Sequence, residues 1–141
     1  MDRKEFLLKA GQCTAVLVFG SCLNSCSPGS STGNIPTAPQ NVDFTLDLSK
    51  QENSALNSVG GYLYQGGIII AKINDNTFSA LSQVCTHQGA TVDYEASAKR
   101  FHCPNHGSNF DINGNVINGP AASPLQKYNT SLIGTNLRVY S

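Results

Sequence analysis

Alternation of hydrophobic and polar positions marks the start of a folded region at Val42. Val42, Phe44, Leu46 and Leu48 are separated by polar residues, and this period of two is typical of a half-buried β-strand. Further short apolar runs, bounded by Gly, Asn or Asp, predict strands over 62–64, 68–73, 77–82, 91–94, 100–102, 110–112, 116–117, 125–128, 131–133 and 137–140. The segment 53–57 shows no clear pattern. We therefore predict a small all-β domain over residues 42–141.

Turn residues between these runs predict how consecutive strands pair. Asn113-Gly114 between two apolar runs is a strong hairpin signal, and Gly66-Gly67 separates another pair of strands. Short polar side chains at 74–76 and at 134–136 are typical of further turns. The pattern indicates antiparallel pairing.

Residues 1–26 predict an export signal. Met1 to Lys9 form a charged segment, and Ala15 to Phe19 lie at the centre of an apolar run that is too short for a permanent membrane span. The alternative is an amphipathic N-terminal helix of the fold. The stretch Arg3 to Leu7 resembles a variant of the twin-arginine signal, which exports folded proteins, and the general secretory route stays open.

The end of this signal resembles a lipobox, in which a bacterial lipoprotein is cut before a Cys that becomes acylated. Leu23 to Cys26 match it better than the rival site at Cys22, because Leu stands at the third position before Cys26. We predict lipidation of Cys26 and hence a bacterial membrane-anchored lipoprotein facing the periplasm or the cell surface. A cleaved secretory signal with incidental Cys residues is the alternative.

Residues 27–41 predict a flexible tether between this anchor and the domain. The segment is rich in Pro, Gly, Ser and Thr and holds no charged residue. Such a composition is too polar to pack a core of its own.

Charge and cysteine content narrow the function classes. The chain has 141 residues, with nine basic and nine acidic side chains, which allows one domain and a tail. No basic run follows the first ten residues, so nucleic acid is not an expected partner. Five Cys residues do not make a disulfide framework, and only Cys85 and Cys103 lie in the predicted domain.

Each of these two Cys residues has a His at ligand spacing. Cys85 and His87 are two residues apart, and Cys103 and His106 are three apart. Thiolates and imidazoles are ligands for iron and for zinc. The motifs Cys-Thr-His-x-Gly and Cys-Pro-x-His-Gly-Ser-x-Phe-Asp closely resemble those of the Rieske iron–sulfur family. The resemblance implies an antiparallel β-sandwich with a small cluster-binding subdomain, formed by two ligand loops and a proline loop at 119–125.

The resemblance also implies a 2Fe–2S cofactor and a role for each ligand. Cys85 and Cys103 would bind the inner iron, and His87 and His106 the outer iron near the surface. Replacing two thiolates by imidazoles makes the cluster less negative, which raises its reduction potential. In the same way the resemblance implies further residues around the cluster. Gly89 and Gly107 are the loop glycines, and the Ser108 hydroxyl would bond a bridging sulfide. Phe110 lies two positions after that serine, and Pro120 is the proline of the third loop.

Three positions depart from the members of the family that oxidise quinols. Ala90 and Asn105 replace two Cys residues that link the ligand loops by a disulfide, and Phe110 replaces a Tyr whose hydroxyl bonds a cysteine sulfur. Fewer donors to the cluster mean a lower potential. We predict a potential between those proteins and the ferredoxins of ring-hydroxylating systems.

The predicted function is one-electron transfer by a membrane-tethered carrier between redox protein partners. No motif indicates a substrate pocket, a mononuclear iron triad or a nucleotide site, so a free-standing enzyme is not expected. One alternative is a Rieske subunit of a larger quinol or arsenite oxidase complex, with a quinol oxidase or cytochrome as partner. The other is a Cys2His2 zinc-binding structural module. His102 lies next to Cys103 and is interpreted as structural.

Overall fold

The computed structural model describes residues 35–141. The predicted export signal over 1–26, the lipidation site at Cys26 and residues 27–34 of the predicted tether lie outside the described residues. Within 35–141 no helix has the length and hydrophobicity needed to cross a membrane.

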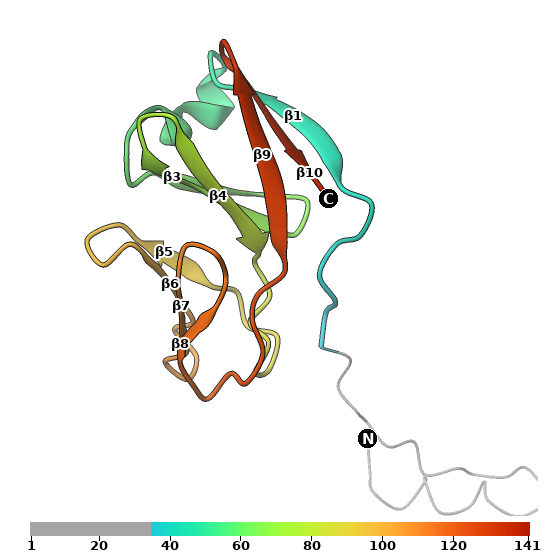
Figure 1. Ribbon diagram of the computed structural model, residues 1–141, viewed down its shortest axis with the longest axis vertical. Coiled ribbons are helices and arrows are strands. Elements are labelled where there is room, and N and C mark those ends of the chain that lie inside the picture. Colours follow the sequence, from blue (N-terminus) through green and yellow to red (C-terminus); the bar gives the residue numbers. More distant parts are fainter. Residues whose placement is uncertain (1–34) are drawn as a thin grey trace, which may run out of the picture. The chain divides into compact units, whose positions relative to one another are not determined.

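Two antiparallel sheets make up the described domain, which confirms the predicted fold class (Figure 1). The larger sheet has six strands in the order β1-β10-β9-β4-β3-β2, and the smaller has four in the order β5-β6-β7-β8. The strands of the larger sheet are β1 (Asp43–Asp47), β2 (Tyr62–Gln65), β3 (Ile68–Asn74), β4 (Thr77–Ser82), β9 (Lys127–Ile133) and β10 (Asn136–Tyr140). The smaller sheet consists of β5 (Asp93–Glu95), β6 (Arg100–His102), β7 (Asn109–Phe110) and β8 (Val116–Asn118).

Strand β3 is buried on both faces and separates two hydrophobic cores. Side chains alternate between the faces of a strand, so Ile68 and Ile70 enter one core while Ile69, Ala71 and Ile73 enter the other. The first core lies within the curled larger sheet and includes Leu46, Leu56, Phe78, Tyr128, Leu137 and Val139. The second joins the larger sheet to the smaller one and includes Leu81, Cys85, Val92, Phe101, Cys103 and Phe110.

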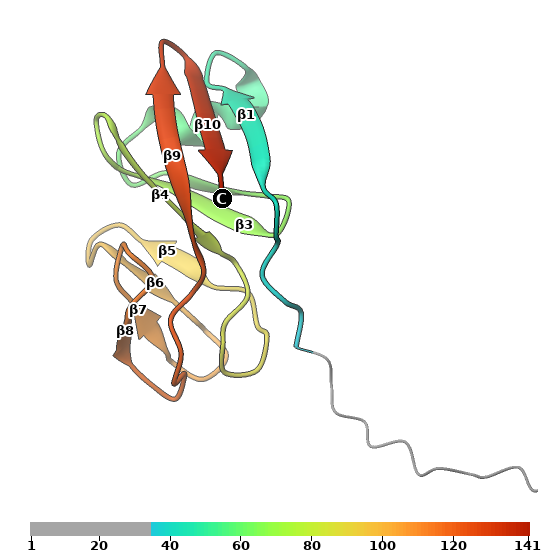
Figure 2. The ribbon, with the colours of Figure 1, turned by 45° about the vertical axis from the view of Figure 1, so that its right-hand side comes forward.

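The two ligand loops and the proline loop belong to the end of the domain that holds the smaller sheet. The first ligand loop follows β4, the second connects β6 to β7, and the proline loop runs from β8 back to β9. The smaller sheet lies at the bottom of Figures 1 and 2, and the β9–β10 hairpin lies at the top. The smaller sheet therefore serves as the frame for the loops.

The structure differs from the predicted elements most clearly in three places. One strand, β9 (Lys127–Ile133), replaces the two strands predicted over 125–128 and 131–133, and residues 125–126 precede it. The strand predicted over 110–112 is only two residues long, because Asp111 accepts bonds from the turn that follows it. The unclear segment 53–57 belongs to a 3-10 helix, η1 (Gln51–Asn57), which Leu56 anchors by complete burial.

Candidate metal centre

The two ligand loops share one backbone conformation. In the first loop the Cys85 amide donates to the Ala90 carbonyl over 2.8 Å, and the Gly89 amide donates to the Cys85 carbonyl over 2.9 Å. In the second loop the same two bonds, of 2.8 and 2.9 Å, join Cys103 to Ser108 and Gly107 to Cys103. Gly89 and Gly107 have φ angles of 79° and 80°, a left-handed conformation that glycine adopts without a steric penalty.

These repeated loops bring the two thiols together inside the domain. Cys85 and Cys103 are 0% and 1% exposed and are not joined by a disulfide. Burial raises the pKa of the Cys85 thiol, and the adjacent Cys103 thiol raises it further. Hydrogen bonds from the backbone N–H groups of His87 and Gln88 act in the opposite direction and lower that pKa. The net effect is a raised pKa of the Cys85 thiol, because burial outweighs the two backbone donors.

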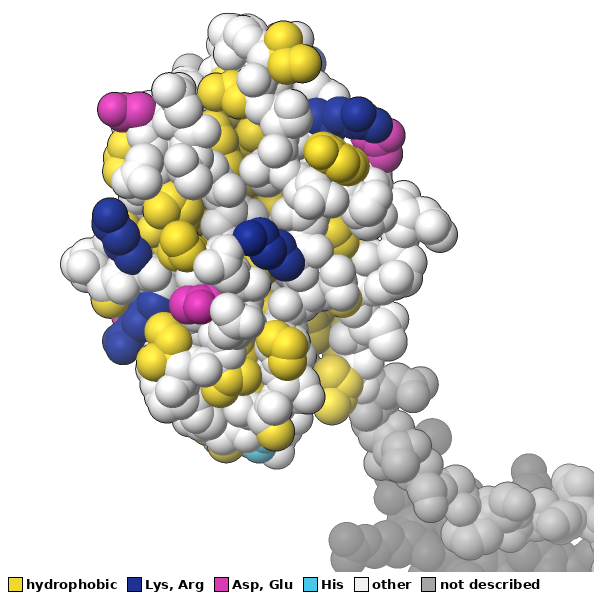
Figure 3. Space-filling view, in the orientation of Figure 1, with side chains coloured by type: hydrophobic (Ala, Val, Ile, Leu, Met, Phe, Trp, Pro, Cys, Tyr) yellow, Lys and Arg dark blue, Asp and Glu magenta, His cyan; other side chains and the backbone are white. Residues whose placement is uncertain are grey.

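The two imidazoles lie together in a more exposed position than the thiols. The ring centroids of His87 and His106 are 4.9 Å apart, with an angle of 85° between the ring planes. His87 is half-buried and His106 is exposed. Figure 3 shows a histidine at the lower end of the molecule, among apolar and uncharged polar side chains. The pair is accessible to a partner, whereas the thiols are not.

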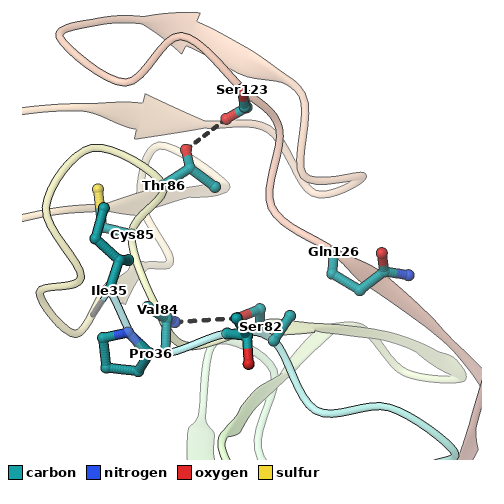
Figure 4. A pocket seen from close by; sticks show the side chains of 10 residues that line it. Ile35, Pro36, Ser82, Val84, Cys85, Thr86, Ser123 and Gln126 are labelled. Atoms are coloured by element: carbon teal, nitrogen blue, oxygen red, sulfur yellow. Dashed lines mark hydrogen bonds between the residues drawn. The ribbon is translucent and has the colours of Figure 1, made fainter. Parts of the chain in front are cut away.

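The proline loop is hydrogen-bonded to both ligand loops. The Thr86 hydroxyl donates to the Ser123 carbonyl over 2.6 Å, a contact visible in Figure 4. The buried Ser108 hydroxyl oxygen accepts a bond of 2.9 Å from the Ala121 amide. One bond links the proline loop to each ligand loop, and no disulfide joins the two ligand loops directly. The proline loop therefore helps to hold both ligand loops in place.

A group of polar side chains that the sequence analysis missed supports the second ligand loop. The Asn118 side-chain amide donates to the Gly107 carbonyl over 2.9 Å and to the Gly119 carbonyl over 3.0 Å. Asn109, which is buried, donates to Asn118 over 2.7 Å, and its oxygen lies 2.8 Å from His102 Nδ1. No sequence signal identifies these asparagines, because most of the bonds join residues that are not neighbours in the sequence.

The three positions that depart from the quinol-oxidising members lie at the loops and beneath them. Phe110 is fully buried in the same core as both thiols. Ala90 packs against that core, whereas Asn105 is exposed, with its side-chain nitrogen 3.2 Å from His106 Nδ1. Pro120 is exposed on the proline loop.

The donor set matches a two-iron cluster better than a single ion. Two thiols form a buried pair and two imidazoles form an outer pair, which provides two ligands of one kind for each of two metals. A structural zinc site needs four ligands around one point. Within residues 35–141 no three His, Cys, Asp or Glu side chains converge on a position for one metal ion.

Comparison with known proteins agrees with this geometry. The family described as Rieske [2Fe-2S] domain matches residues 39–129. The chain is 43% identical over 58 residues to a cytochrome b6-f complex iron-sulfur subunit of Synechococcus sp. (strain JA-3-3Ab), covering 41% of this chain and 34% of the relative. The chain is also 49% identical over 45 residues to the subunit of that name from Prochlorococcus marinus (strain AS9601), covering 32% of this chain and 25% of the relative. The chain therefore matches only about a third or less of these relatives' length.

Two solved structures share the fold. The plasma membrane Rieske protein PetC3 of Synechocystis PCC 6803 superposes with a TM-score of 0.54 at 30% identity, covering 62% of this chain and 93% of that one. A ferredoxin of carbazole 1,9a-dioxygenase from Nocardioides aromaticivorans IC177 has a TM-score of 0.50 at 24% identity, covering 58% of this chain and 84% of that one. The second likeness concerns the fold alone.

The fold and the paired donors define an iron–sulfur electron-transfer domain. The chain belongs to the Rieske 2Fe–2S family, because the match to this family covers well over half of the chain. Its cofactor is a 2Fe–2S cluster, which sets aside the zinc-binding alternative, and the family and the named relatives support Rieske-type electron transfer.

Proposed function

We propose that Cys85 and Cys103 bind the inner iron of the cluster and that His87 and His106 bind the outer iron. The observation that carries this assignment is the buried thiol pair with the more exposed imidazole pair beside it. A 2Fe–2S cluster bound there takes up and gives back one electron. The exposed histidine side is where electrons enter and leave, because the thiol side is enclosed by the core.

Neighbouring groups adjust how readily the centre is reduced. The Ser108 hydroxyl oxygen accepts a hydrogen bond from the Ala121 amide. Its own proton is therefore left for donation to a sulfide of the cluster. The backbone N–H groups of His87 and Gln88 already point at the Cys85 sulfur. Hydrogen bonds to sulfur stabilise the more negative, reduced state. Phe110 contributes no such bond.

Metal analysis and spectroscopy test this proposal. Purified protein should contain two irons and two acid-labile sulfides per chain. After reduction it should give the EPR signal of a Rieske centre, with a mean g value near that of other members. One zinc per chain and no sulfide would refute the assignment.

The proposal includes export and attachment to a membrane through an acylated Cys26. Leu23 to Cys26 support it at the sequence level, and the structural relative of 30% identity is named as a plasma membrane protein. Mass spectrometry of the native protein should find a chain that begins at an acylated Cys26. Cys26→Ser should move the protein out of the membrane fraction, whereas Cys22→Ser should leave it there. Retention of residues 1–25 would argue against this anchor.

A second candidate function is that of a subunit in a larger oxidoreductase complex. The curated relatives are named as subunits of the cytochrome b6-f complex, which favours this candidate. Mild solubilisation of native membranes followed by size separation distinguishes a lone carrier from a subunit of a complex. A lone carrier should migrate at the size of the single acylated chain, and a subunit should migrate with cytochromes.

A further inference from the structure

Residues 35–39, called the strap here, pack against the first ligand loop at Gly89. A Cβ built on Gly89 would lie 2.9 Å from Pro36 Cδ and 3.3 Å from Ile35 Cγ2, which is closer than side chains normally pack. Both strap residues and Cys85 border the same cavity in Figure 4. The position therefore needs a glycine both for its φ of 79° and for the space that the strap occupies.

Gly107 holds the equivalent position in the second ligand loop and has no such neighbour. Its φ is 80°, and its amide bonds the carbonyl of the preceding ligand Cys, as the amide of Gly89 does. Among the described residues, no atom beyond its chain neighbours would lie within 4 Å of a Cβ built on Gly107. The two loops thus share one backbone conformation and differ in what lies outside the glycine.

Hydrogen bonds hold the second loop at this glycine. The Asn118 side-chain amide donates to the Gly107 carbonyl over 2.9 Å, and the buried Asn109 donates to the same carbonyl over 3.3 Å. Both asparagines belong to the smaller sheet, in β8 and β7. The first loop has the packed strap at the corresponding glycine. Each ligand loop is therefore held by a different element.

The other end of the strap is fixed to the larger sheet. Pro39 Cγ lies 2.8 Å from the Cβ position of Gly67, and the Tyr128 hydroxyl donates to the Pro39 carbonyl over 2.8 Å. Between its two ends the strap borders a cavity of about 360 Å³, which the first ligand loop and the proline loop also line. The strap therefore holds the first loop through a local contact at Gly89, which a substitution can remove.

His87 lies between two restraints on the first loop. On one side the Thr86 hydroxyl bonds the proline loop, and on the other side the strap packs on Gly89. The backbone N–H groups of His87 and Gln88, which bond the Cys85 sulfur, belong to the same stretch. Movement of Gly89 away from the core would therefore shift the imidazole and weaken both N–H donors.

We infer that Ile35 and Pro36 are positioning residues for His87, and that they keep the first ligand loop closed around the cluster. This inference rests on the proposed ligand role of His87. Because Cys85 and Cys103 form no disulfide and the strap touches only one loop, the restraint acts on the first loop alone. Hydrogen bonds to sulfur stabilise the reduced state, so a loosened first loop should lower the reduction potential.

Hydrogen–deuterium exchange of the holoprotein tests the restraint on each loop separately. Ile35→Ala with Pro36→Ala removes the strap contacts, and mass spectrometry of peptides from the two ligand loops follows the exchange of their amides. Exchange in the first loop should become about fivefold faster, the order expected from losing the partial burial of two apolar side chains. Exchange in the second loop should stay unchanged.

Val59→Ala with Gln40→Ala is the matched control for this double variant. Both residues are exposed and lie outside the contact with Gly89, so both loops should exchange at the native rate. An unchanged first loop in the strap variant, or an equal rise in both loops, would overturn the inference.

Alanine at the two loop glycines separates the strap contact from backbone strain. Gly89→Ala and Gly107→Ala place a side chain at nearly the same positive φ, so they share the same local cost. Only Gly89→Ala presses a Cβ against Pro36. The cluster of Gly89→Ala should therefore be lost to an iron chelator faster than that of Gly107→Ala, and Pro36→Ala should reduce this excess. Equal rates in the two glycine variants would contradict the inference.

Electrochemistry distinguishes positioning from general support of the fold. The Ile35→Ala, Pro36→Ala protein should have a lower reduction potential and a broader EPR signal than the native protein. Ile35→Val, which keeps the γ-methyl group at the contact, should preserve both native values. A native potential in the double variant would reduce the strap to structural support and overturn the inference.

The same measurements separate this inference from the ligand assignment. A His87→Ala protein that keeps two irons and two sulfides would refute the assignment, and with it the inference. Native exchange of the first loop in a fully loaded strap variant would refute the inference alone.

Discussion

The Ser108 hydroxyl oxygen accepts a hydrogen bond of 2.9 Å from the Ala121 amide and so joins the second ligand loop to the proline loop. The bond is buried, and it fixes the direction in which the remaining hydroxyl proton can be donated. One side chain therefore holds a loop and keeps a hydroxyl proton available for the proposed bond to the cluster.

Ser108→Ala should lower the reduction potential. A hydrogen bond to a charged group contributes about 1.5–3 kcal/mol, and 59 mV corresponds to a tenfold change for one electron, so the shift should be up to roughly 100 mV. Protein-film voltammetry measures it. Ser79→Ala is the control, because the buried Ser79 hydroxyl donates to the Ile112 carbonyl over 2.7 Å and is not part of a ligand loop. An unchanged potential in Ser108→Ala would show that its hydroxyl does not reach the cluster.

Phe110→Tyr should raise the potential by a comparable amount. The ring is fully buried in the core that contains both thiols, and the added hydroxyl would supply a donor beside a cysteine sulfur. Phe78→Tyr, in the other core, should leave the potential unchanged and controls for the cost of a new buried hydroxyl. Equal potentials for Phe110→Tyr and the native protein would place the hydroxyl out of reach of sulfur.

The native potential should fall in the middle of the range of about −150 to +300 mV that such centres span. Ser108 raises it, whereas Phe110 and the absence of the inter-loop disulfide at Ala90 and Asn105 keep it below that of quinol-oxidising members. Voltammetry of the purified protein at neutral pH gives the value directly. A potential at either extreme of the range would show that other groups dominate.

Removal of any proposed ligand should abolish cluster assembly. Cys85→Ser, His87→Ala, Cys103→Ser and His106→Ala each remove one metal bond, and the loops are held in part by the metal. Iron and sulfide content and the visible absorption spectrum report the loss. His102→Gln is the matched control: His102 bonds Asn109 instead, so this protein should keep two irons and two sulfides. A fully loaded cluster in any of the four ligand variants would reject that residue as a ligand.

Tyr64 should stabilise the junction between the two sheets in a pH-dependent way. Its hydroxyl donates to the Val92 carbonyl over 2.9 Å and to the Asp93 carboxylate over 2.8 Å. Burial, and then the bond to Asp93, raise the pKa of Tyr64 above its usual value near 10. The fold thus favours the neutral phenol, so its contribution is fully present below about pH 10 and is lost as the pH rises above that value.

Tyr64→Phe should therefore lower the free energy of unfolding by about 1 kcal/mol at neutral pH. Denaturant titration of the holoprotein at pH 7 and at alkaline pH measures the difference, which should shrink in alkali. Tyr140→Phe, on β10, controls for the loss of a tyrosine hydroxyl away from this junction. A Tyr64→Phe protein as stable as the native one at pH 7 would contradict this role of the Tyr64 hydroxyl.

The sequence by itself determined the features that depend on neighbouring residues. The spacings of Cys85 to His87 and of Cys103 to His106 lie within single loops, so the donor set could be predicted without a fold. The cofactor class followed from the resemblance of the two loop motifs to a known family. Alternation along 42–48 and the Asn113-Gly114 turn likewise identified strands and a hairpin, because side-chain direction and turn angles are local properties.

Only the tertiary structure decided the features that join distant segments. Burial of β3 on both faces, the Thr86–Ser123 bond and the Asn109–Asn118 pair each connect residues with no common local pattern. The same holds for Pro36 at Gly89. Each is an ordinary loop residue in the sequence, and they lie side by side only because the fold brings residues 35–39 to the first ligand loop. Long-range packing and hydrogen bonding thus decided how the loops are held and where residues 35–39 pack on the domain.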